Sequence, residues 1–219
     1  LCDLDNDGWK DLFITSGIYR RANDLDYIRF LTGDNRYFPT RDNSQASNRD
    51  LYEQMPLQPD VNHFFRNLGN LGFRDMGEEW CEELSDFSNG SAYADLDGDG
   101  DLDLVVNNIN SPASIYRNNS ESGTEAHFLS VRLVGSGLNT AGTGSRVRIY
   151  GNGNLQVAEQ HPSIGFMSSS SQVLHFGLGK RQGIDSLIIS WPDRREQILY
   201  DISANQLLIL DQEEAALPG

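Results

Sequence analysis

The sequence is poor in the residues that most often mark disulfide-rich, catalytic or metal-binding proteins. It contains two cysteines and four histidines in 219 residues. Cys2 and Cys81 could pair, but two residues do not make a disulfide framework, and two small buried thiols are the favoured interpretation. All four histidines lack a metal-binding spacing such as HExxH and are interpreted as structural: His63, His127, His161 and His175. The alternation around His175 predicts that it lies on the exposed face of a strand.

Basic residues are scarce as well, with 17 Lys and Arg against 32 Asp and Glu and a formal net charge of −15. Residues 1–120 hold 22 of the acidic residues and 10 of the basic ones, so the negative field is concentrated there. This balance disfavours nucleic-acid binding, which needs clustered Lys and Arg, and favours metal ions or basic partners. No apolar run approaches the length of a membrane span, so no transmembrane segment is expected in this fragment.

Alternating aspartates form the most organised stretch that the sequence does contain. Residues 95–103 read Asp-Leu-Asp-Gly-Asp-Gly-Asp-Leu-Asp, and the pattern D-x-D-x-D-G-x-x-D recurs 92 residues earlier, at residues 3–11. Crowded like charges are unfavourable without a counter-ion, and Ca²⁺ takes alternating carboxylates as ligands. We therefore predict two Ca²⁺ sites, with Trp9 and Asp101 contributing backbone carbonyls. The predicted ligands are Asp3, Asp5, Asp7, Trp9 and Asp11 in the first loop and Asp95, Asp97, Asp99, Asp101 and Asp103 in the second.

A solvated acidic turn is the alternative for either loop alone, but two matched copies favour calcium. Mg²⁺ is less favoured because it demands stricter octahedral geometry. The repeat has a second half, in which residues 64–67 (Phe-Phe-Arg-Asn) resemble residues 115–118 (Ile-Tyr-Arg-Asn). The first copy carries about 41 extra residues, roughly from Gly17 to Val61. Such an insertion is often the binding element of a repeat, and two pieces of it, Asn23–Leu31 and Ser47–Met55, are predicted to be helical.

After residue 120 the sequence changes to short alternating stretches separated by glycine-rich turns. Before the second Asp loop, Glu78–Asp86 is predicted to form a helical turn, and in the part after residue 120 Gly165–Ser171 is expected to form an exposed loop. Phe166 and Met167 in that loop are either a contact tip or a core anchor. Seven strands are predicted, which suggests an antiparallel sandwich or barrel: 128–134, 146–150, 155–160, 173–176, 186–191, 197–200 and 206–211.

The N-terminal part resembles the FG-GAP/VCBS repeats. The resemblance rests on Asn89–Ala94, the Asp loop that follows it, the Leu-Val-Val-Asn run and Tyr116-Arg117-Asn118. It implies blades of an integrin-like β-propeller, with calcium in the loop between two strands of a blade. A propeller needs several blades. Because only about two blade-equivalents are present and the chain begins inside a motif, further blades are expected before Leu1.

The C-terminal part resembles the ASPIC/UnbV domain. The matching stretches are 128–133, 139–147, 173–179, 191–193 and 205–206. Two positions depart from the family pattern, with Arg194 where Gly is common and Ser145 where Ala is usual. The pairing of the two resemblances is similar to that in cartilage acidic protein-like exported proteins.

These observations together predict an all-β fold, with partial β-propeller blades in residues 1–120, including the insertion at about 17–61, and an antiparallel β-sandwich-like domain in residues 121–219. The expected function is a calcium-binding, non-catalytic, secreted or cell-surface adhesion module that recognises a protein or glycan, with no nucleic-acid partner. The alternative is a carbohydrate-active lyase or hydrolase, or its accessory subunit, on a calcium-stabilised scaffold. No Ser–His–Asp set can be singled out, and the best-organised carboxylates are assigned to metal.

Overall fold

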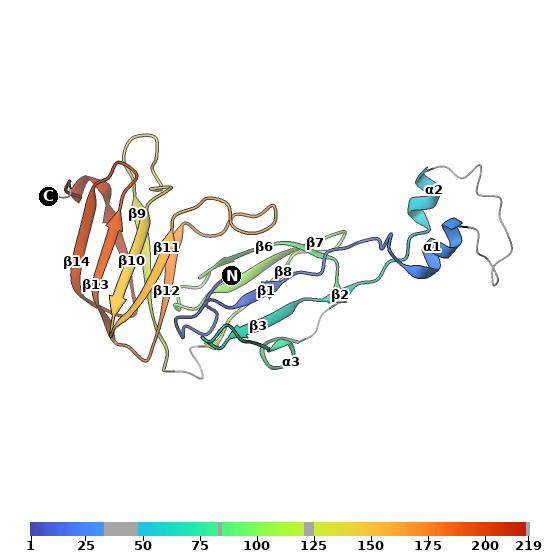
Figure 1. Ribbon diagram of the computed structural model, residues 1–219, viewed down its shortest axis with the longest axis horizontal. Helices are drawn as coiled ribbons and strands as arrows, with labels where there is room; N and C mark the ends of the chain where they lie inside the picture. Colours follow the sequence, from blue (N-terminus) through green and yellow to red (C-terminus); the bar gives the residue numbers. More distant parts are fainter. Residues whose placement is uncertain (33–47, 83–84, 121–124, 218–219) are drawn as a thin grey trace.

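The molecule is elongated and predominantly β, with a sandwich at one end, two small sheets in the middle and a pair of short helices at the other end (Figure 1). This computed structural model describes residues 1–32, 48–82, 85–120 and 125–217. Strands predominate over short helices in these ranges, so the all-β prediction is confirmed. No helix in these ranges is long and apolar enough to cross a membrane.

Two three-stranded antiparallel sheets form the middle of the molecule. One has the order β1-β3-β4 and the other β6-β7-β8. Their registers match, since Leu12 of β1 faces Phe65 of β3 while Leu104 of β7 faces Tyr116 of β8. The internal repeat read from the sequence is thus also a structural repeat. The strands are β1 Leu12–Ile14, β3 His63–Asn67, β4 Phe73–Asp75, β6 Ser88–Ala94, β7 Asp103–Asn108 and β8 Ser114–Tyr116.

One apolar cluster holds the two sheets together. Phe64 of the first sheet packs on Phe13 at 4.7 Å between ring centroids and on Tyr116 of the second sheet at 5.9 Å. Cys2 is buried in this cluster, and burial raises the pKa of its thiol to about 12. Cys2 and Cys81 are both free thiols, as interpreted from the sequence, although Cys81 is only half-buried.

The sandwich consists of a four-stranded sheet with the order β11-β10-β13-β14 and a three-stranded sheet with the order β12-β9-β15. Inward-facing side chains of both sheets form its core, among them Leu129, Val147 and Leu187, which are fully buried. All seven predicted strands are present. They are β9 His127–Val134, β10 Arg146–Gly151, β11 Asn154–Glu159, β12 Val173–Gly179, β13 Gly183–Ser190, β14 Glu196–Ser203 and β15 Gln206–Asp211, and a 3₁₀ turn, Gln212–Glu214, follows.

One pairing in the sandwich differs from the antiparallel prediction, because β15 runs parallel to β9. The link between β14 and β15 is short, and it carries the chain from one sheet to the other instead of closing a hairpin. Asn205 in this link has a positive φ of 58° and its backbone N–H donates to the carbonyl of Phe128 at 2.7 Å. That bond directs the last strand alongside β9.

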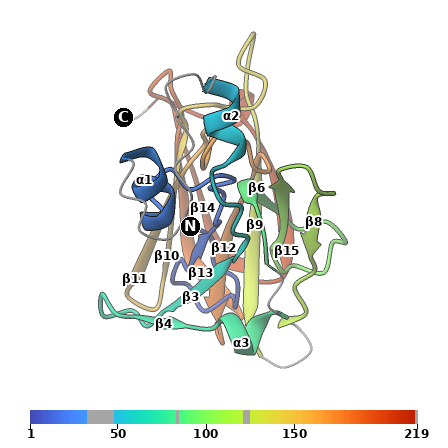
Figure 2. The same cartoon turned by 90° about the vertical axis from the view of Figure 1, so that its right-hand side faces the viewer.

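The described part of the insertion projects away from both sheets (Figure 1) and carries two helices, α1 Leu25–Thr32 and α2 Asn48–Glu53, which face the viewer in Figure 2. Both predicted helices are present, but α1 is capped by Asp24, not Asn23, since Asp24 Oδ1 accepts from the backbone of Tyr27 at 3.0 Å. The expected cap Ser47 lies outside the described residues. Arg20 donates to three carbonyls at the end of α2, those of Tyr52, Glu53 and Met55.

One further expectation needs correction, and one open alternative is decided by the structure. The helical turn predicted for Glu78–Asp86 is limited to α3 Gly77–Trp80, while Ser85–Asp86 forms strand β5, which pairs with β2 Asp60–Val61. Phe166 and Met167 are 65% and 90% exposed, so they form a tip and not a core anchor. The loop that carries them lies along β6, where the Ser171 amide donates to the carbonyl of Tyr93 at 3.2 Å.

Candidate metal centres

The two Asp loops, which we call loop 1 (residues 3–11) and loop 2 (residues 95–103), share one internal hydrogen-bond pattern. In each loop the first Asp accepts from the Gly five residues on, the third Asp from the residue two positions on, and the last Asp from the residue after the first. The Gly8 amide lies 2.9 Å from the Asp3 carboxylate, and the Gly100 amide lies 3.1 Å from that of Asp95. The Trp9 amide lies 2.8 Å from Asp7, and the Asp101 amide lies 3.0 Å from Asp99. The Leu4 amide lies 2.9 Å from Asp11, and the Leu96 amide lies 3.0 Å from Asp103. Loop closure therefore follows from the aspartate and glycine spacing itself.

The last Asp of each loop also fixes the loop to its sheet. Asp11 Oδ1 accepts from the backbone of Asn67 at 2.9 Å, and Asp103 Oδ1 accepts from the backbone of Asn118 at 2.8 Å. This contact gives a role to the Asn of the Arg-Asn pair that ends each second half of the repeat. The sequence identified these segments as the second half of the repeat but did not predict this contact.

Loop 1 gathers a buried carboxylate cluster. Ligand oxygens of Asp3, Asp5 and Asp11 lie within 4.8 Å of one another. Burial raises the pKa of Asp3 to about 8 and that of Asp11 to about 6, and burial together with the charge of Asp7 raises the pKa of Asp5. It is therefore unfavourable for all three carboxylates to be deprotonated when no cation is bound.

One oxygen of this cluster has no internal partner. Asp3 is 6% exposed, and its Oδ1 is buried with no hydrogen-bond partner among the residues that the structure describes. In loop 2 the matching oxygen, Asp95 Oδ1, accepts from the backbone of Gly98 at 2.7 Å. A buried, unpartnered carboxylate oxygen costs free energy unless a proton or a cation satisfies it, so the donor set of loop 1 fits a hard cation.

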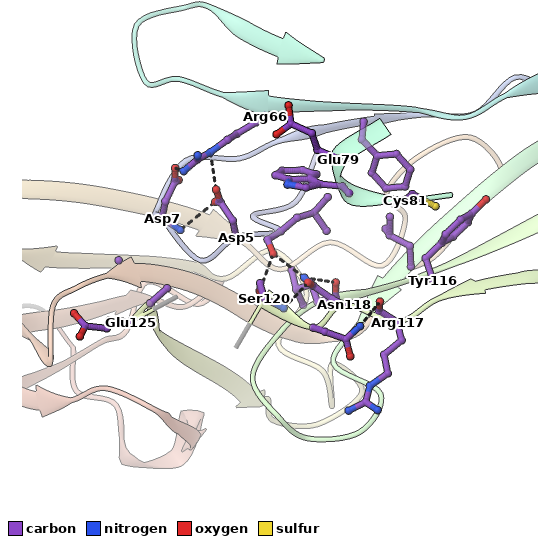
Figure 3. A pocket seen from close by; sticks show the side chains of 18 of the residues that line it. Asp5, Asp7, Arg66, Glu79, Cys81, Tyr116, Arg117, Asn118, Ser120 and Glu125 are labelled. Atoms are coloured by element: carbon purple, nitrogen blue, oxygen red, sulfur yellow. Dashed lines mark hydrogen bonds and ion pairs between the residues drawn. The ribbon is translucent and has the colours of Figure 1, made fainter. Parts of the chain in front are cut away.

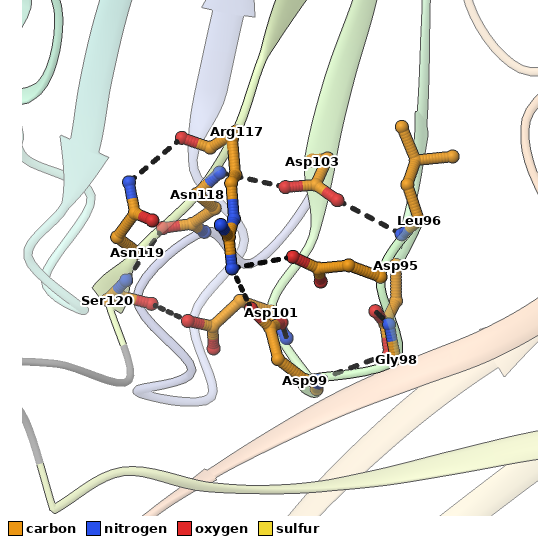
Figure 4. Close-up of polar contacts among 12 residues, drawn as sticks. Asp95, Leu96, Gly98, Asp99, Asp101, Asp103, Arg117, Asn118, Asn119 and Ser120 are labelled. Atoms are coloured by element: carbon orange, nitrogen blue, oxygen red, sulfur yellow. Dashed lines mark hydrogen bonds and ion pairs between the residues drawn. The ribbon is translucent and has the colours of Figure 1, made fainter.

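Loop 2 gathers Asp95, Asp97 and Asp99, whose ligand oxygens also lie within 4.8 Å of one another (Figure 4). Asp95 and Asp97 are partly exposed, so this cluster is more open to solvent than that of loop 1. An entering ion would find acidic oxygens already assembled in both loops.

An arginine lies beside each cluster. Arg66 Nε is 2.6 Å from Asp5 and its Nη2 is 3.2 Å from Asp7, while Arg117 Nη2 is 2.8 Å from Asp97. These arginines are the first members of the repeated Arg-Asn pairs. Sequence reasoning used those pairs only to align the repeat, although their matched position before Asn67 and Asn118 was the available signal for a role at the loops.

The structure does not bring all ten predicted ligands together. Asp7 is placed with Arg66, and both oxygens of Asp103 accept backbone amides. The carboxylate of Asp101 bonds Asn6 Nδ2 at 2.7 Å and Ser120 Oγ at 2.8 Å, which leaves its carbonyl as the predicted donor. Trp9 points its ring toward Gly69, where an added Cβ would lie 2.9 Å from the indole.

The prediction of an exposed His175 is wrong, because loop 1 covers the outer face of β12. His175 lies out of phase with the core residues, as expected, but its Nε2 is 2.6 Å from Asn6 Oδ1 and its Nδ1 is 3.3 Å from Ser130 Oγ. Its ring also stacks on Phe128 at 5.8 Å, and burial lowers its pKa to about 4. His175 is therefore a neutral contact between the sandwich and loop 1.

A cavity of about 790 Å³ lies between the two small sheets, next to both loops (Figure 3). Its apolar lining includes Phe64, Trp80 and Tyr116, and Asn119 adds a side-chain amide. The Asn118 amide also lines the cavity but is already bonded to the carbonyls of Leu4 and Leu102. Charged residues of both signs stand at its border, namely Asp5, Asp7, Arg66, Glu79, Glu82, Arg117, Glu125 and Lys180. A concave, largely apolar site with a few polar groups is typical of ligand-binding pockets.

Comparison with known proteins supports the C-terminal part of this description. A family model described as "ASPIC and UnbV" matches residues 135–217, which begin after both loops. The chain is 31% identical over 156 residues to Cartilage acidic protein 1 of Xenopus tropicalis, covering 62% of this chain and 22% of that protein. It is 30% identical over 141 residues to the protein of the same name from Homo sapiens, covering 55% and 19%. The chain thus spans about a fifth of the length of these relatives.

Proposed function

We propose that this chain is part of a secreted or cell-surface, non-catalytic binding module that holds two Ca²⁺ ions in loop 1 and loop 2. The observation that carries the proposal is the duplicated loop geometry, in which two acidic clusters 92 residues apart are closed by the same hydrogen bonds. The buried, unpartnered oxygen of Asp3 supports it independently, because it needs a positive partner.

The proposed ligands are drawn from the ten residues predicted from the sequence and centre on the clustered carboxylates of Asp3, Asp5 and Asp11 in loop 1 and Asp95, Asp97 and Asp99 in loop 2, with carbonyl donors from Trp9 and Asp101. Bound calcium would neutralise the clustered carboxylates and so stabilise the folded chain. Arg66 and Arg117 would share the carboxylates with the ions, because each already contacts two aspartates of its loop.

We further propose that each loop and its sheet belong to one FG-GAP/VCBS-type blade. In the second sheet, β6 pairs with β7 and ends at the pair Ala94–Asp103. The matching pair in the first copy is the isolated bridge between Cys2 and Asp11. Leu1 and Cys2 therefore occupy the place at which β6 ends in the other copy.

The proposed ligand site is the cavity between the two sheets, and a glycan or peptide is the proposed ligand. Aromatic faces such as those of Trp80 and Tyr116 can stack on sugar rings or apolar side chains, and the nearby amide of Asn119 can hydrogen-bond hydroxyl or peptide groups. The likeness to proteins named Cartilage acidic protein 1 supports an extracellular setting.

A carbohydrate-active enzyme is the second candidate, and one observation favours it: Glu79, Glu82 and Lys180 line the same cavity. Glu79, however, is ion-paired with Arg74, and its side chain is 53% exposed. A screen of glycans and peptides that measures both binding and product formation separates the two candidates, since turnover would favour the enzyme.

The calcium proposal is tested by thermal unfolding of the full chain with excess Ca²⁺ and with EDTA. At a free concentration one hundred times Kd, one ion contributes about 2.7 kcal/mol, so we expect Tm to rise by roughly 5 °C or more. Asp3→Asn should remove part of this shift, whereas Glu53→Gln, at an exposed helix pair of the insertion, should keep it. Equal Tm values in Ca²⁺ and EDTA for the unaltered chain would contradict the proposal.

A further inference from the structure

Loop 1 and loop 2 differ at one matched position, where loop 1 has Asn6 and loop 2 has Gly98. Both residues have a positive φ, 56° for Asn6 and 81° for Gly98. A Cβ added to Gly98 would meet nothing within 4 Å, whereas Asn6 is 3% exposed. Glycine adopts this backbone conformation more readily than asparagine, so loop closure alone does not require Asn6.

Asn6 instead makes four contacts outside its own loop. Its Nδ2 donates to the carbonyl of Gly100 at 3.1 Å and to Asp101 Oδ1 at 2.7 Å, both in loop 2. Its Oδ1 therefore faces His175, whose Nε2 must carry the proton of that 2.6 Å bond. Its carbonyl accepts from the backbone of Gly179 at 2.7 Å. One side chain thus joins the two acidic loops and the sandwich.

Close packing holds loop 1 against the sandwich at this point. A Cβ added to Gly177 of β12 would lie 2.0 Å from Asp3 Oδ2 and 2.6 Å from the carbonyl carbon of Asn6. Gln156 of β11, in the other sheet of the sandwich, donates to the carbonyl of Gly177 at 2.7 Å. Loop 1 therefore packs directly against β12.

We infer that Asn6 is a positioning residue that couples the two metal loops to each other and to the sandwich. This inference rests on the proposed calcium function. Asn6 lies between Asp5 and Asp7, so an ion held by these residues orders its amide, and the ordered amide presents its hydrogen bonds to Gly100 and Asp101 of loop 2. Because coupling between sites is reciprocal, an ion in loop 2 must favour binding in loop 1 to the same extent.

Asn6→Gly is the matched test, because it copies the residue of loop 2 and keeps the positive φ while it removes the side-chain bridges. Calorimetric titration of the metal-free full chain with Ca²⁺ should reveal positive coupling of about fivefold or more between the two ions. The variant should bind both ions independently. Asn6→Asp places a charge beside Asp101 and cannot donate, so this variant should bind Ca²⁺ more weakly than Asn6→Gly. The side chain introduced by Gly98→Asn enters open space, so that variant should leave the coupling unchanged.

Hydrogen exchange in EDTA gives a readout that does not depend on metal. The Gly179 amide, which donates to the carbonyl of residue 6, should exchange about tenfold faster in Asn6→Gly than in the unaltered chain. Unchanged exchange would overturn the link to the sandwich. Independent binding of two ions by the unaltered chain would overturn the coupling alone, and a chain that binds no calcium would overturn both the coupling and the proposed function.

Discussion

Ser145 occupies a fully buried position in the turn before β10, where its hydroxyl has no hydrogen-bond partner within the described part of the chain. A buried hydroxyl without a partner costs free energy because it has lost its bonds to water. Alanine, the usual residue of the family that this segment resembles, would carry no such cost. Arg194, the other departure from that pattern, has a φ of 71° where glycine is common.

We expect Ser145→Ala to raise the free energy of unfolding by about 1 kcal/mol, because it removes the unsatisfied hydroxyl without creating a large cavity. The midpoint of urea unfolding at unchanged m value measures this change. Ser130→Ala is the matched control on β9, since the Ser130 hydroxyl is 3.3 Å from His175 Nδ1 and its loss should lower stability. A Ser145→Ala variant that loses as much stability as Ser130→Ala would contradict the argument.

The aspartates of both loops were predictable from the sequence at the level of single residues, because their spacing encodes the turn chemistry. The role of Asn6 was not, since it acts on groups distant in sequence. The roles of Arg66 and Arg117 were missed, although their matched positions in the repeat were a signal for them. Asn6 reaches Asp101, and Arg66 reaches Asp5 and Asp7. A pattern of side-chain types does not reveal such contacts when only one copy of the repeat carries the residue, as with Asn6.

At the scale of elements, alternation predicted the sandwich strands well because one face of each strand is buried in a common core. The parallel placement of β15 was not predictable, because alternation specifies a face and not a neighbour. The covered outer face of β12 was missed for a related reason, as the sequence of a strand does not indicate which other segment packs on it.

The close packing of loop 1 on β12 leads to a prediction about Gly177. Gly177→Ala should lower the free energy of unfolding by about 1–3 kcal/mol, because the added methyl group overlaps Asp3 and the backbone of Asn6. Thermal unfolding measures the loss. Gly77→Ala in α3, whose nearest neighbour to an added Cβ is Asp75 Oδ1 at 3.4 Å, should be close to neutral. Equal stability of the two variants would show that loop 1 does not need this close approach.

At the scale of the whole molecule, the buried carboxylates of loop 1 make stability depend on pH when no metal is bound. The folded pKa of Asp3, about 8, lies above its ordinary value of 3.8, so the folded chain keeps a proton that the unfolded chain releases. Stability therefore falls as pH rises toward 8. His175 has the opposite effect, because its lowered pKa of about 4 makes stability rise with pH between about 4 and 6.5.

The decisive window is thus pH 6.5 to 8, in which Asp3 titrates in the folded chain, while His175 is neutral in the folded chain and loses the rest of its charge in the unfolded chain. In EDTA we expect Tm to fall across this window. In excess Ca²⁺ the fall should disappear or reverse, because calcium binds the deprotonated carboxylates. Asp3→Asn, which keeps a neutral group, should flatten the EDTA profile. A Tm that rises from pH 6.5 to 8 in EDTA would contradict the prediction.

The parallel pair β9–β15 also sets the order in which the molecule can assemble. The first strand of the sandwich obtains one of its two neighbours from the last strand, so the sheet is complete only when about 80 intervening residues have been brought together. Such non-local pairing is slow compared with the local closure of an Asp loop. During synthesis, loop 1 emerges well before Gly177 and Gly179, on which it comes to rest. Loop 1 therefore lacks this contact with the sandwich until β12 has been synthesised.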